Sequence, residues 1–236
     1  MISLKGKNCL ITGATGGIGK EIAELMIQEG CNLFLTSENE CKLKNFSIQL
    51  KKKYKKNIEW ANCDFSDIHN LYGFAFNEFF RKTDILINSV GIFYKKELED
   101  TEPNILRNIF SINLMSPIKM CEMIIPFMRE RKWGRIVNIG SSSSYNGYAK
   151  TTLYCATKHG ILGFSRALHD EVKKDGIRVF CVSPAGVKTK MGKIASNNNY
   201  DTFLNPKEVA EYIVSSIKYD KEMIINEIRL NRNNDK

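Results

Sequence analysis

The sequence of 236 residues contains no apolar run near the ~20 residues that a transmembrane helix needs. Its start lacks the charged and then apolar pattern of a secretory signal, so we expect a cytoplasmic protein without a membrane partner. Internal repeats and Pro- or Gly-rich linkers are also missing, which predicts one domain over residues 1–236. Apolar residues make up 43 % of the chain, too many for a disordered protein.

The sequence also lacks the spacing of a metal site. Its seven cysteines form no Cys-x-x-Cys pair, and their number is odd. Only three histidines are present, and none stands at a spacing typical of metal ligands. We therefore expect reduced thiols in the core of the protein and no metal.

Positive charge exceeds negative charge, with 35 Lys and Arg against 26 Asp and Glu. The excess would suit a nucleic acid or another acidic partner. However, the densest basic run, 51–56, falls where a predicted helix ends, and the helix dipole favours positive charge there. We expect no nucleic-acid function. A steep salt dependence of nucleic-acid binding would identify the alternative.

Apolar, β-branched runs alternate along the chain with longer segments of helical period. We expect strands at 7–12, 32–36, 58–62, 84–88, 135–139, 177–183 and 223–228. We expect helices at 17–29, 38–53, 66–81, 101–131, 152–174 and 206–217. This alternation predicts an α/β fold, a single Rossmann-type doubly wound parallel sheet of about seven strands with helices on both faces.

A glycine-rich segment, Thr-Gly-Ala-Thr-Gly-Gly-Ile-Gly, follows the first predicted strand and opens the first helix. Glycines at this turn let a pyrophosphate approach the backbone, and the helix N-terminus offers free N–H groups and a positive dipole end. Glycines also occur in ordinary strand–helix turns, so the prediction of a nucleotide site depends on the position of this segment directly after the first strand. The predicted nucleotide contacts here are Gly13, Thr15, Gly16, Gly17, Ile18 and Gly19.

Three residues in the middle of the chain suit hydride-transfer chemistry. Tyr154 and Lys158 lie four residues apart at the start of a predicted helix, so their side chains share one face. Ser141 stands thirteen residues before the tyrosine, just after a predicted strand. Reduction of a carbonyl needs a proton for its oxygen, and a nearby ammonium and an oxidised nicotinamide would lower the pKa of the phenol. Ser141 would hold the substrate oxygen.

The glycine-rich segment, Ser141 and Tyr-x-x-x-Lys together resemble the short-chain dehydrogenase/reductase family over essentially the whole chain. Gly13, Gly17 and Gly19 fit the TGxxxGxG form of that family, whereas Gly13, Gly16 and Gly19 fit the TGxxGxxG form of its extended relatives. Extended members need about 100 more residues for a substrate domain, so the length favours the short form. The resemblance implies that Asn113 is a fourth catalytic residue, which kinks its helix and holds a water linked to Lys158.

The same resemblance implies further cofactor contacts at two strand ends. Asp64 and Phe65 follow the third predicted strand, where an acid of the family bonds the adenine. Asn88-Ser-Val-Gly91 resembles the family's NNAG with two substitutions. The ordinary alternative for each segment is a helix cap or a strand-end turn.

A late segment, Ser-Pro-Ala-Gly-Val-Lys-Thr-Lys-Met, resembles the family's PGxVxTxM loop. Pro184, Val187 and Thr189 would contact the nicotinamide and the phosphates, although Ala185 replaces a glycine of the family. A short lid over the substrate is expected near 188–205. The complete set of predicted cofactor contacts is Gly13, Thr15, Gly16, Gly17, Ile18, Gly19, Ser37, Asp64, Phe65, Asn88, Gly91, Tyr154, Lys158, Pro184, Val187 and Thr189.

The second predicted strand bears on the choice between NADP and NAD. An acid that selects NAD would fall at Ser37 by resemblance, and it is absent. The arginine common in NADP-binding members would fall at Gly16 or Glu38, and it is absent too. The small hydroxyl at Ser37 leaves room for a phosphate, which Thr36 and Asn39 could also bind. We expect NADP, with NAD as the alternative if Glu38 bonds the ribose.

These features predict an NAD(P)-dependent oxidoreductase that moves a hydride between the cofactor and a small ketone, aldehyde or secondary alcohol, with tyrosine as acid and base. One alternative is a 3-oxoacyl-carrier-protein reductase, whose acidic carrier would suit the basic chain. Against it, residues 223–230 lack the usual glycine pair and look more like the ending of members acting on small hydroxy acids. Another alternative is a non-catalytic nucleotide sensor. The resemblance implies a homodimer or homotetramer built on helix 101–131 and the helix after Tyr154.

Overall fold

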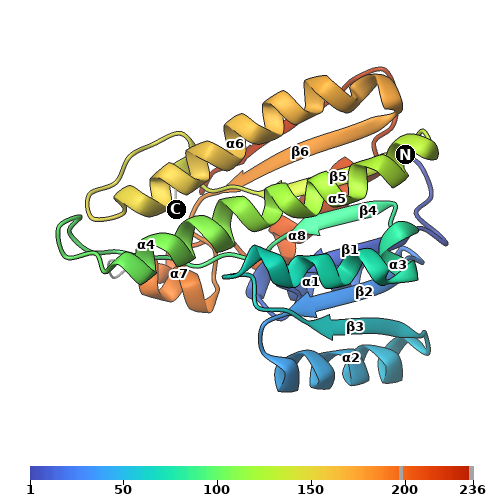
Figure 1. The fold of residues 1–236 in the computed structure, drawn as a ribbon, viewed down its shortest axis with the longest axis horizontal. Helices are drawn as coiled ribbons and strands as arrows, with labels where there is room; N and C mark the ends of the chain where they lie inside the picture. The colour runs from blue at the N-terminus through green and yellow to red at the C-terminus, as the bar shows by residue number, and fades with distance from the viewer. Residues whose placement is uncertain (197–198, 234–236) are drawn as a thin grey trace.

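Seven parallel strands form the central sheet in the computed structural model, which describes residues 1–196 and 199–233. They stand in the order β3-β2-β1-β4-β5-β6-β7 and point toward the same end of the molecule (Figure 1). The strands are β1 Asn8–Thr12, β2 Asn32–Ser37, β3 Ile58–Asn62, β4 Ile85–Asn88, β5 Gly134–Ile139, β6 Ile177–Pro184 and β7 Glu227–Leu230. The predicted α/β fold is confirmed.

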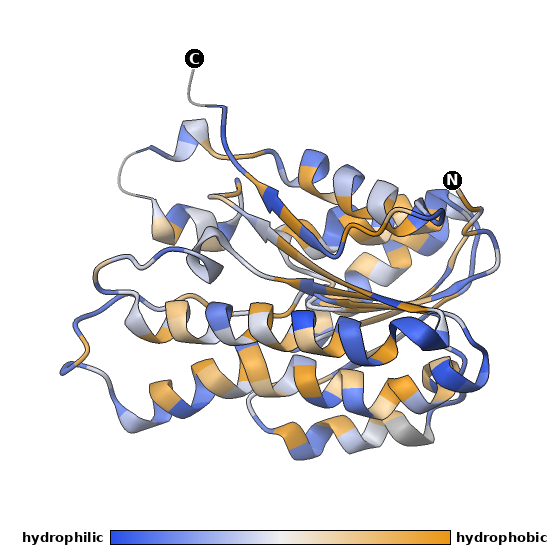
Figure 2. Cartoon of the chain, turned by 90° about the horizontal axis from the view of Figure 1, so that it is seen from above, coloured by the Kyte–Doolittle hydropathy of each residue, from blue (hydrophilic) through white to orange (hydrophobic). Residues whose placement is uncertain are grey.

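Helices cover both faces of the sheet, as Figure 2 shows with the sheet between two helical layers. They are α1 Gly17–Gln28, α2 Glu40–Tyr54, α3 Glu78–Arg81, α4 Pro103–Phe110, α5 Ser116–Glu130, α6 Thr152–Val172, α7 Lys190–Ala195 and α8 Pro206–Lys218. Successive strand residues point to opposite faces, so Ile85 and Ile87 join the core beneath α1, α2 and α8, whereas Leu86 joins the core beneath α5 and α6. Burial on both faces explains why the strands are continuously apolar.

The helix predicted over 66–81 is instead two short elements. A 3₁₀ helix runs over Ile68–Phe76, and α3 begins after an extended residue, Asn77. The side chain of Asn77 accepts a hydrogen bond from the N–H of Phe80, so it caps α3 and prevents a continuous helix. Asp67 caps the 3₁₀ helix by accepting from the N–H of His69.

The last strand begins at Glu227, four residues later than predicted. The reason is an ionic cluster that holds the preceding segment. Arg178 donates to the carbonyls of Tyr219 and Lys221 and pairs with Asp220 at 2.9 Å. This chain segment is therefore fixed beside the start of β6, and it joins the sheet only after turning back.

The long helix predicted over 101–131 is a continuous helical stretch, Pro103–Glu130, in which a π-helical turn over Ser111–Met115 separates α4 from α5. Among the described residues, it is the one helix long and apolar enough to cross a membrane by length and composition. Half of its most apolar window is buried inside the protein, as in a core helix. Leu106 and Met115 are its exposed large apolar residues.

Arg135 is buried at the amino end of β5, where its guanidinium pairs with Asp220 at 2.8 Å and lies 4.4 Å from the centre of the Trp133 ring. Burial lowers the pKa of Arg135 to about 10, although Asp220 opposes this shift. The Nε atom of Arg135 has no hydrogen-bond partner. This end of the sheet is therefore held by an ion pair between the buried Arg135 and the half-buried Asp220.

Six of the seven cysteines are buried, as expected for core thiols, but Cys41 is exposed on α2. Burial raises the pKa of the Cys121 thiol to about 12, so this thiol stays protonated at neutral pH. In the described part of the chain, no three His, Cys, Asp or Glu side chains gather where they could hold a metal ion.

Candidate active site

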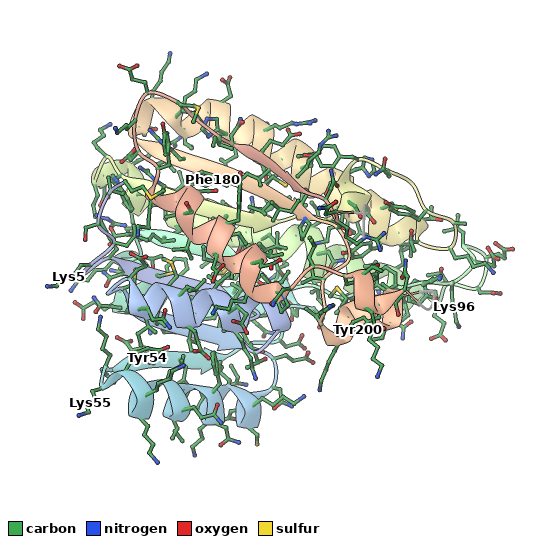
Figure 3. The ribbon with its side chains drawn as sticks, turned by 180° about the vertical axis from the view of Figure 1, so that it is seen from behind. Lys5, Tyr54, Lys55, Lys96, Phe180 and Tyr200 are labelled. Atoms are coloured by element: carbon green, nitrogen blue, oxygen red, sulfur yellow. The ribbon has the colours of Figure 1, made fainter. Side chains whose placement is uncertain are left out.

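A cavity of about 840 Å³ opens at the carboxyl ends of the strands. Segments that follow β1, β4, β5, β6 and β7 line it, together with residues of α7. Figure 1 shows α7 near the carboxyl ends of the strands. In Figure 3, Tyr200 and Lys96 mark this end of the molecule, whereas Lys5 and Lys55 lie at the other. The predicted site residues that line the cavity are Thr15, Gly16, Gly17, Ile18, Gly91, Ser141, Tyr154, Lys158, Pro184, Val187 and Thr189.

The glycines at the start of α1 divide into two groups. Gly13 has a φ of +65°, and a Cβ there would lie 2.7 Å from the backbone nitrogen of Val90. A Cβ at Gly19 would lie 2.4 Å from the carbonyl oxygen of Gly13. These two glycines therefore permit close packing of the turn.

Gly16 and Gly17 face the cavity instead. Gly16 is the N-cap of α1 and provides no side-chain cap, which leaves the first N–H groups of the helix for a ligand. A Cβ at Gly17 would lie 2.3 Å from Cγ2 of Thr189 across the cleft. A bare helix N-terminus of this kind fits the pyrophosphate of a dinucleotide.

Ser141 is held by Ser143 and Ser144, which belong to the same run of serines. Its Oγ accepts a hydrogen bond from the N–H of Ser143 at 3.1 Å, and its own N–H donates to Oγ of Ser144 at 3.1 Å. This capping box starts a 3₁₀ turn over Ser142–Ser144. The serine run therefore positions the hydroxyl of Ser141 at the end of β5.

Tyr154 lies in the first turn of α6 with its side chain buried beneath the cavity. Its ring meets the ring of Phe93 edge to face, with 4.9 Å between centroids. Burial raises the pKa of Tyr154 to about 12, and a side-chain hydrogen bond with Ser141 opposes this rise. Without a bound nicotinamide, removal of the ring from water dominates the pKa of Tyr154, and the lowered pKa in the complex with an oxidised nicotinamide remains a prediction.

Lys158 lies one turn further along α6, with its Nζ 5.6 Å from the centre of the Tyr154 ring. The Nζ donates a hydrogen bond to the carbonyl of Ile139 at 2.8 Å. Burial lowers the pKa of Lys158 to about 8. At neutral pH the lysine is mostly protonated, and it places a positive charge beside the phenol.

Asn113 lies in the π-helical turn and is buried outside the cavity lining. Its Nδ2 donates to Oγ1 of Thr157 at 3.3 Å, which ties the turn to α6. A Cβ built on Gly91 would lie 3.4 Å from Oδ1 of Asn113 and 3.9 Å from Nζ of Lys158. Asn113 therefore stands directly behind the strand-end turn that Lys158 faces.

Four other predicted cofactor residues lie outside the cavity lining. Asn88 donates to Oδ1 of Asn138 at 2.8 Å inside the core, and Phe65 is buried. Asp64 is exposed, and its carboxylate accepts a hydrogen bond from the N–H of Ser66. The hydroxyl of Ser37 lies 2.6 Å from that of Thr15, which does line the cavity.

The sequence profile of short chain dehydrogenases matches residues 7–199. The chain belongs to the short-chain dehydrogenase family. It is therefore an NAD(P)-dependent oxidoreductase with a Rossmann fold, and its family implies a small-molecule substrate.

Relatives of this short-chain dehydrogenase span most or nearly all of the chain. An uncharacterised oxidoreductase of Staphylococcus aureus is 28 % identical over 228 residues, 97 % of this chain and 98 % of that protein. The human very-long-chain 3-oxoacyl-CoA reductase is 34 % identical over 198 residues, 80 % of this chain and 62 % of that protein. The structure of a metagenomic short-chain oxidoreductase in complex with NADP has a TM-score of 0.85 at 24 % identity, and covers 98 % of this chain and 99 % of that one.

The predicted lid of the dehydrogenase lies partly outside the described residues, which omit 197 and 198. The described parts are α7 and a 3₁₀ turn at Tyr200–Thr202. Thr189 caps α7 by accepting a hydrogen bond from the N–H of Gly192 at 3.0 Å. The Phe203 ring packs so closely on Gly186 that a Cβ there would lie 2.6 Å from it.

Several lining residues of this dehydrogenase were missed from sequence. They include Lys20, Phe93, Lys95, Tyr148, Met191, Phe203 and Arg232. Lys20 directly follows the last glycine of the cradle, so its position at the helix start could have indicated a role. Arg232 follows the last strand, and the carboxyl ends of parallel strands border ligand sites. The predicted strand ended at 228, two residues before the observed end at Leu230, and Arg232 is far in sequence from the other lining residues.

Proposed function

We propose that this dehydrogenase reduces the carbonyl group of a small ketone or aldehyde with NADPH, and catalyses the reverse oxidation of a secondary alcohol. The observation that carries the proposal is the convergence of Ser141, Tyr154 and Lys158 on the cavity that Gly16 and Gly17 also line. The geometry fits one reaction, because the proton source and the dinucleotide cradle meet at the same strand ends.

The residues divide the chemistry between them. Bound NADPH would supply the hydride to the carbonyl carbon. The Ser141 hydroxyl would donate a hydrogen bond to the carbonyl oxygen and hold it beside the phenol. Tyr154, which burial keeps protonated at neutral pH, would then give its proton to that oxygen. The ammonium of Lys158 would stabilise the phenolate left behind, at a distance of 5.6 Å from the ring centre.

The residues near the second strand support NADP rather than NAD. Ser37 presents a hydroxyl where an acid would repel the 2′-phosphate, and Thr15 holds that hydroxyl. Lys20 lines the cavity and lies 5.4 Å from the ring centre of Phe46 on α2, so a cation stands on the side of β2. Glu38 is exposed, whereas Ser37 is buried beside Thr15, which lines the cavity. The metagenomic relative in complex with NADP agrees with this choice.

Fluorescence titration with NADPH and NADH, followed by turnover of a carbonyl panel, tests the proposal. We expect tighter binding of NADPH and oxidation of the nucleotide by at least one class of carbonyl. Binding of neither dinucleotide would refute it. Binding without turnover of any carbonyl would favour a nucleotide sensor.

Reduction of a 3-oxoacyl thioester is a second candidate. The observation in its favour is 34 % identity to the human 3-oxoacyl-CoA reductase over 80 % of this chain. Acetoacetyl-CoA in the panel separates the two candidates, since a strong preference for it over small free ketones would select the thioester.

We also propose a homodimer or homotetramer built on the α4–α5 helix and on α6, the helix that contains Tyr154. Leu106 and Met115 expose apolar side chains on that helix, and half of its most apolar window is not buried within one chain. Sedimentation velocity tests this proposal, and a monomer at micromolar concentration would contradict it.

A further inference from the structure

The charged residues that line the cavity all have the same sign. They are Lys20, Lys95, Lys158, Lys190 and Arg232, and no Asp or Glu is among the described lining residues. Lys158 lies beside the reacting tyrosine, and Lys20 is assigned above to the cofactor phosphate. Three cations remain without a role in hydride transfer. A wall that carries only positive charge raises the local concentration of anions.

Arg232 stands far from the adenosine end of the cavity. The glycine-rich segment follows β1, and the adenosine side lies toward β2 and β3. Arg232 follows β7, which is the strand at the opposite edge of the sheet. The 2′-phosphate of the adenosine therefore does not account for this guanidinium, and we place Arg232 in the substrate half of the cavity.

Neighbouring side chains hold Arg232 in place. Its Nη1 donates to Oγ1 of Thr202 at 2.9 Å, and its guanidinium carbon lies 5.4 Å from the ring centre of Phe203. Among the described carboxylates, none forms an ion pair with it. A guanidinium that is oriented in this way keeps donors for a carboxylate, which it can bind through two parallel hydrogen bonds.

We propose that the substrate is an oxo acid whose carboxylate is bound by Arg232 while its carbonyl lies between Ser141 and Tyr154. The inference rests on the proposed reductase function and names its substrate class. Lys95, after β4, and Lys190, at the start of α7, add positive charge to the same cavity. The hydride and its electron pair pass from NADPH to the carbonyl carbon, the proton passes from Tyr154 to the oxygen, and the carboxylate is unchanged.

The test compares each of pyruvate, acetoacetate and levulinate with its own methyl ester, so that charge is the main variable at three chain lengths. We expect at least one acid to show a higher kcat/KM than its ester. In Arg232→Gln the acid-to-ester ratio should fall about tenfold or more, mainly through KM for the acid, because a charge-assisted hydrogen-bonded pair is lost. Arg232→Lys should restore part of the ratio.

Arg229→Gln is the matched control. Arg229 lies on β7 three residues earlier, is exposed, and does not line the cavity, so this variant removes the same charge but should keep the wild-type ratio. Thermal unfolding and NADPH binding establish that each variant is folded. If Arg229→Gln lowered the acid-to-ester ratio as much as Arg232→Gln does, the effect would come from the overall positive charge of the protein, and the inference would be overturned.

The outcomes separate the inference from the proposed function. Efficient reduction of the esters with no preference for any acid would overturn the oxo acid and leave the reductase intact. If no carbonyl is reduced, the reductase proposal fails, and binding of the same acids to the NADPH complex is measured by nucleotide fluorescence. Carboxylate binding that is lost in Arg232→Gln would then support the anion site, and its absence would overturn it.

Discussion

The side chain of Asn113 hydrogen-bonds to both backbone polar groups of Ile92. Its Oδ1 accepts from the N–H at 2.8 Å, and its Nδ2 donates to the carbonyl at 2.9 Å. The π-helical turn therefore holds the segment after β4, including Gly91, against the cavity. In the structure, Asn113 is a residue that positions this segment, and its predicted link to Lys158 through a water remains a prediction.

Replacement of Tyr154 by Phe should lower kcat by about 10²–10⁴-fold, the usual contribution of a general acid. NADPH affinity should be nearly unchanged, because only the hydroxyl is removed. Stopped-flow turnover and nucleotide fluorescence measure the two effects. Tyr212→Phe is the control, since that residue is exposed on α8. Full activity of Tyr154→Phe would refute the proposed proton donor.

The value of kcat/KM for NADPH should fall as the pH rises above about 8. Burial lowers the pKa of Lys158 to about 8, so the free enzyme loses this positive charge above that pH. In Lys158→Arg the guanidinium keeps its charge, and the decline should move to higher pH. A pH profile from 6 to 10 measures this, and an identical decline in both proteins would contradict the assignment.

Lys20→Gln should weaken NADPH binding about tenfold while changing NADH binding little, because a charged partner of the 2′-phosphate is lost. Lys44→Gln, on the exposed face of α2, removes the same charge and should leave the ratio of the two affinities unchanged. Both affinities follow from fluorescence titration. An equal loss for NADPH and NADH would place Lys20 away from the phosphate.

Acid should destabilise the protein through His169. Burial and the nearby Lys173 and Arg178 lower the pKa of His169 below its ordinary value of 6.5, and its Nδ1 accepts a hydrogen bond from the N–H of Val179. As the pH falls below about 6.5, the unfolded chain binds a proton that the folded chain refuses, so the free energy of unfolding decreases. His169→Gln should flatten this dependence in urea titrations from pH 7 to 5, whereas His69→Gln should keep it.

Replacement of two glycines of α6 by Ala should have different effects on the stability of the fold. A Cβ at Gly163 would have no neighbour within 4 Å, so Gly163→Ala should stabilise the fold by about 0.5–1 kcal/mol through helix propensity. A Cβ at Gly160 would lie 3.0 Å from Cδ2 of Leu114, within the π-helical turn. Gly160→Ala should therefore gain less or lose stability. Urea unfolding of both variants measures the difference, and equal gains would contradict the tight contact.

Much of the fold could be predicted because apolar, β-branched runs determine the strands of a parallel sheet. The third strand, Ile58–Asn62, has the predicted bounds. The break at Asn77 depends on one side-chain cap, and the late start of β7 depends on ion pairs between distant residues. Neither of these is visible in local periodicity.

The reacting residues could be predicted because their spacing is a property of one helix and one strand end. Their proton affinities could not, since the pKa of Tyr154 depends on burial by residues from other elements, including Phe93. The role of Ser144 in holding Ser141 likewise needs the backbone of the turn. The presence of Arg232 in the cavity could not be predicted, because this residue is far in sequence from the other lining residues. It lies near them only because of the order of the strands in the sheet.

The pairing of Arg135 with Asp220 lies at one end of β5, and Ser141 follows the other end. Replacement of a buried ion pair by apolar side chains of similar volume is often neutral or stabilising by about 1–4 kcal/mol, and here Arg178, which also pairs with Asp220, would have to be replaced together with them. Engineers could therefore seek heat tolerance at the amino end of the strand and new specificity at the carboxyl end. Substitutions that change stability and substitutions that change specificity would then lie at opposite ends of one strand.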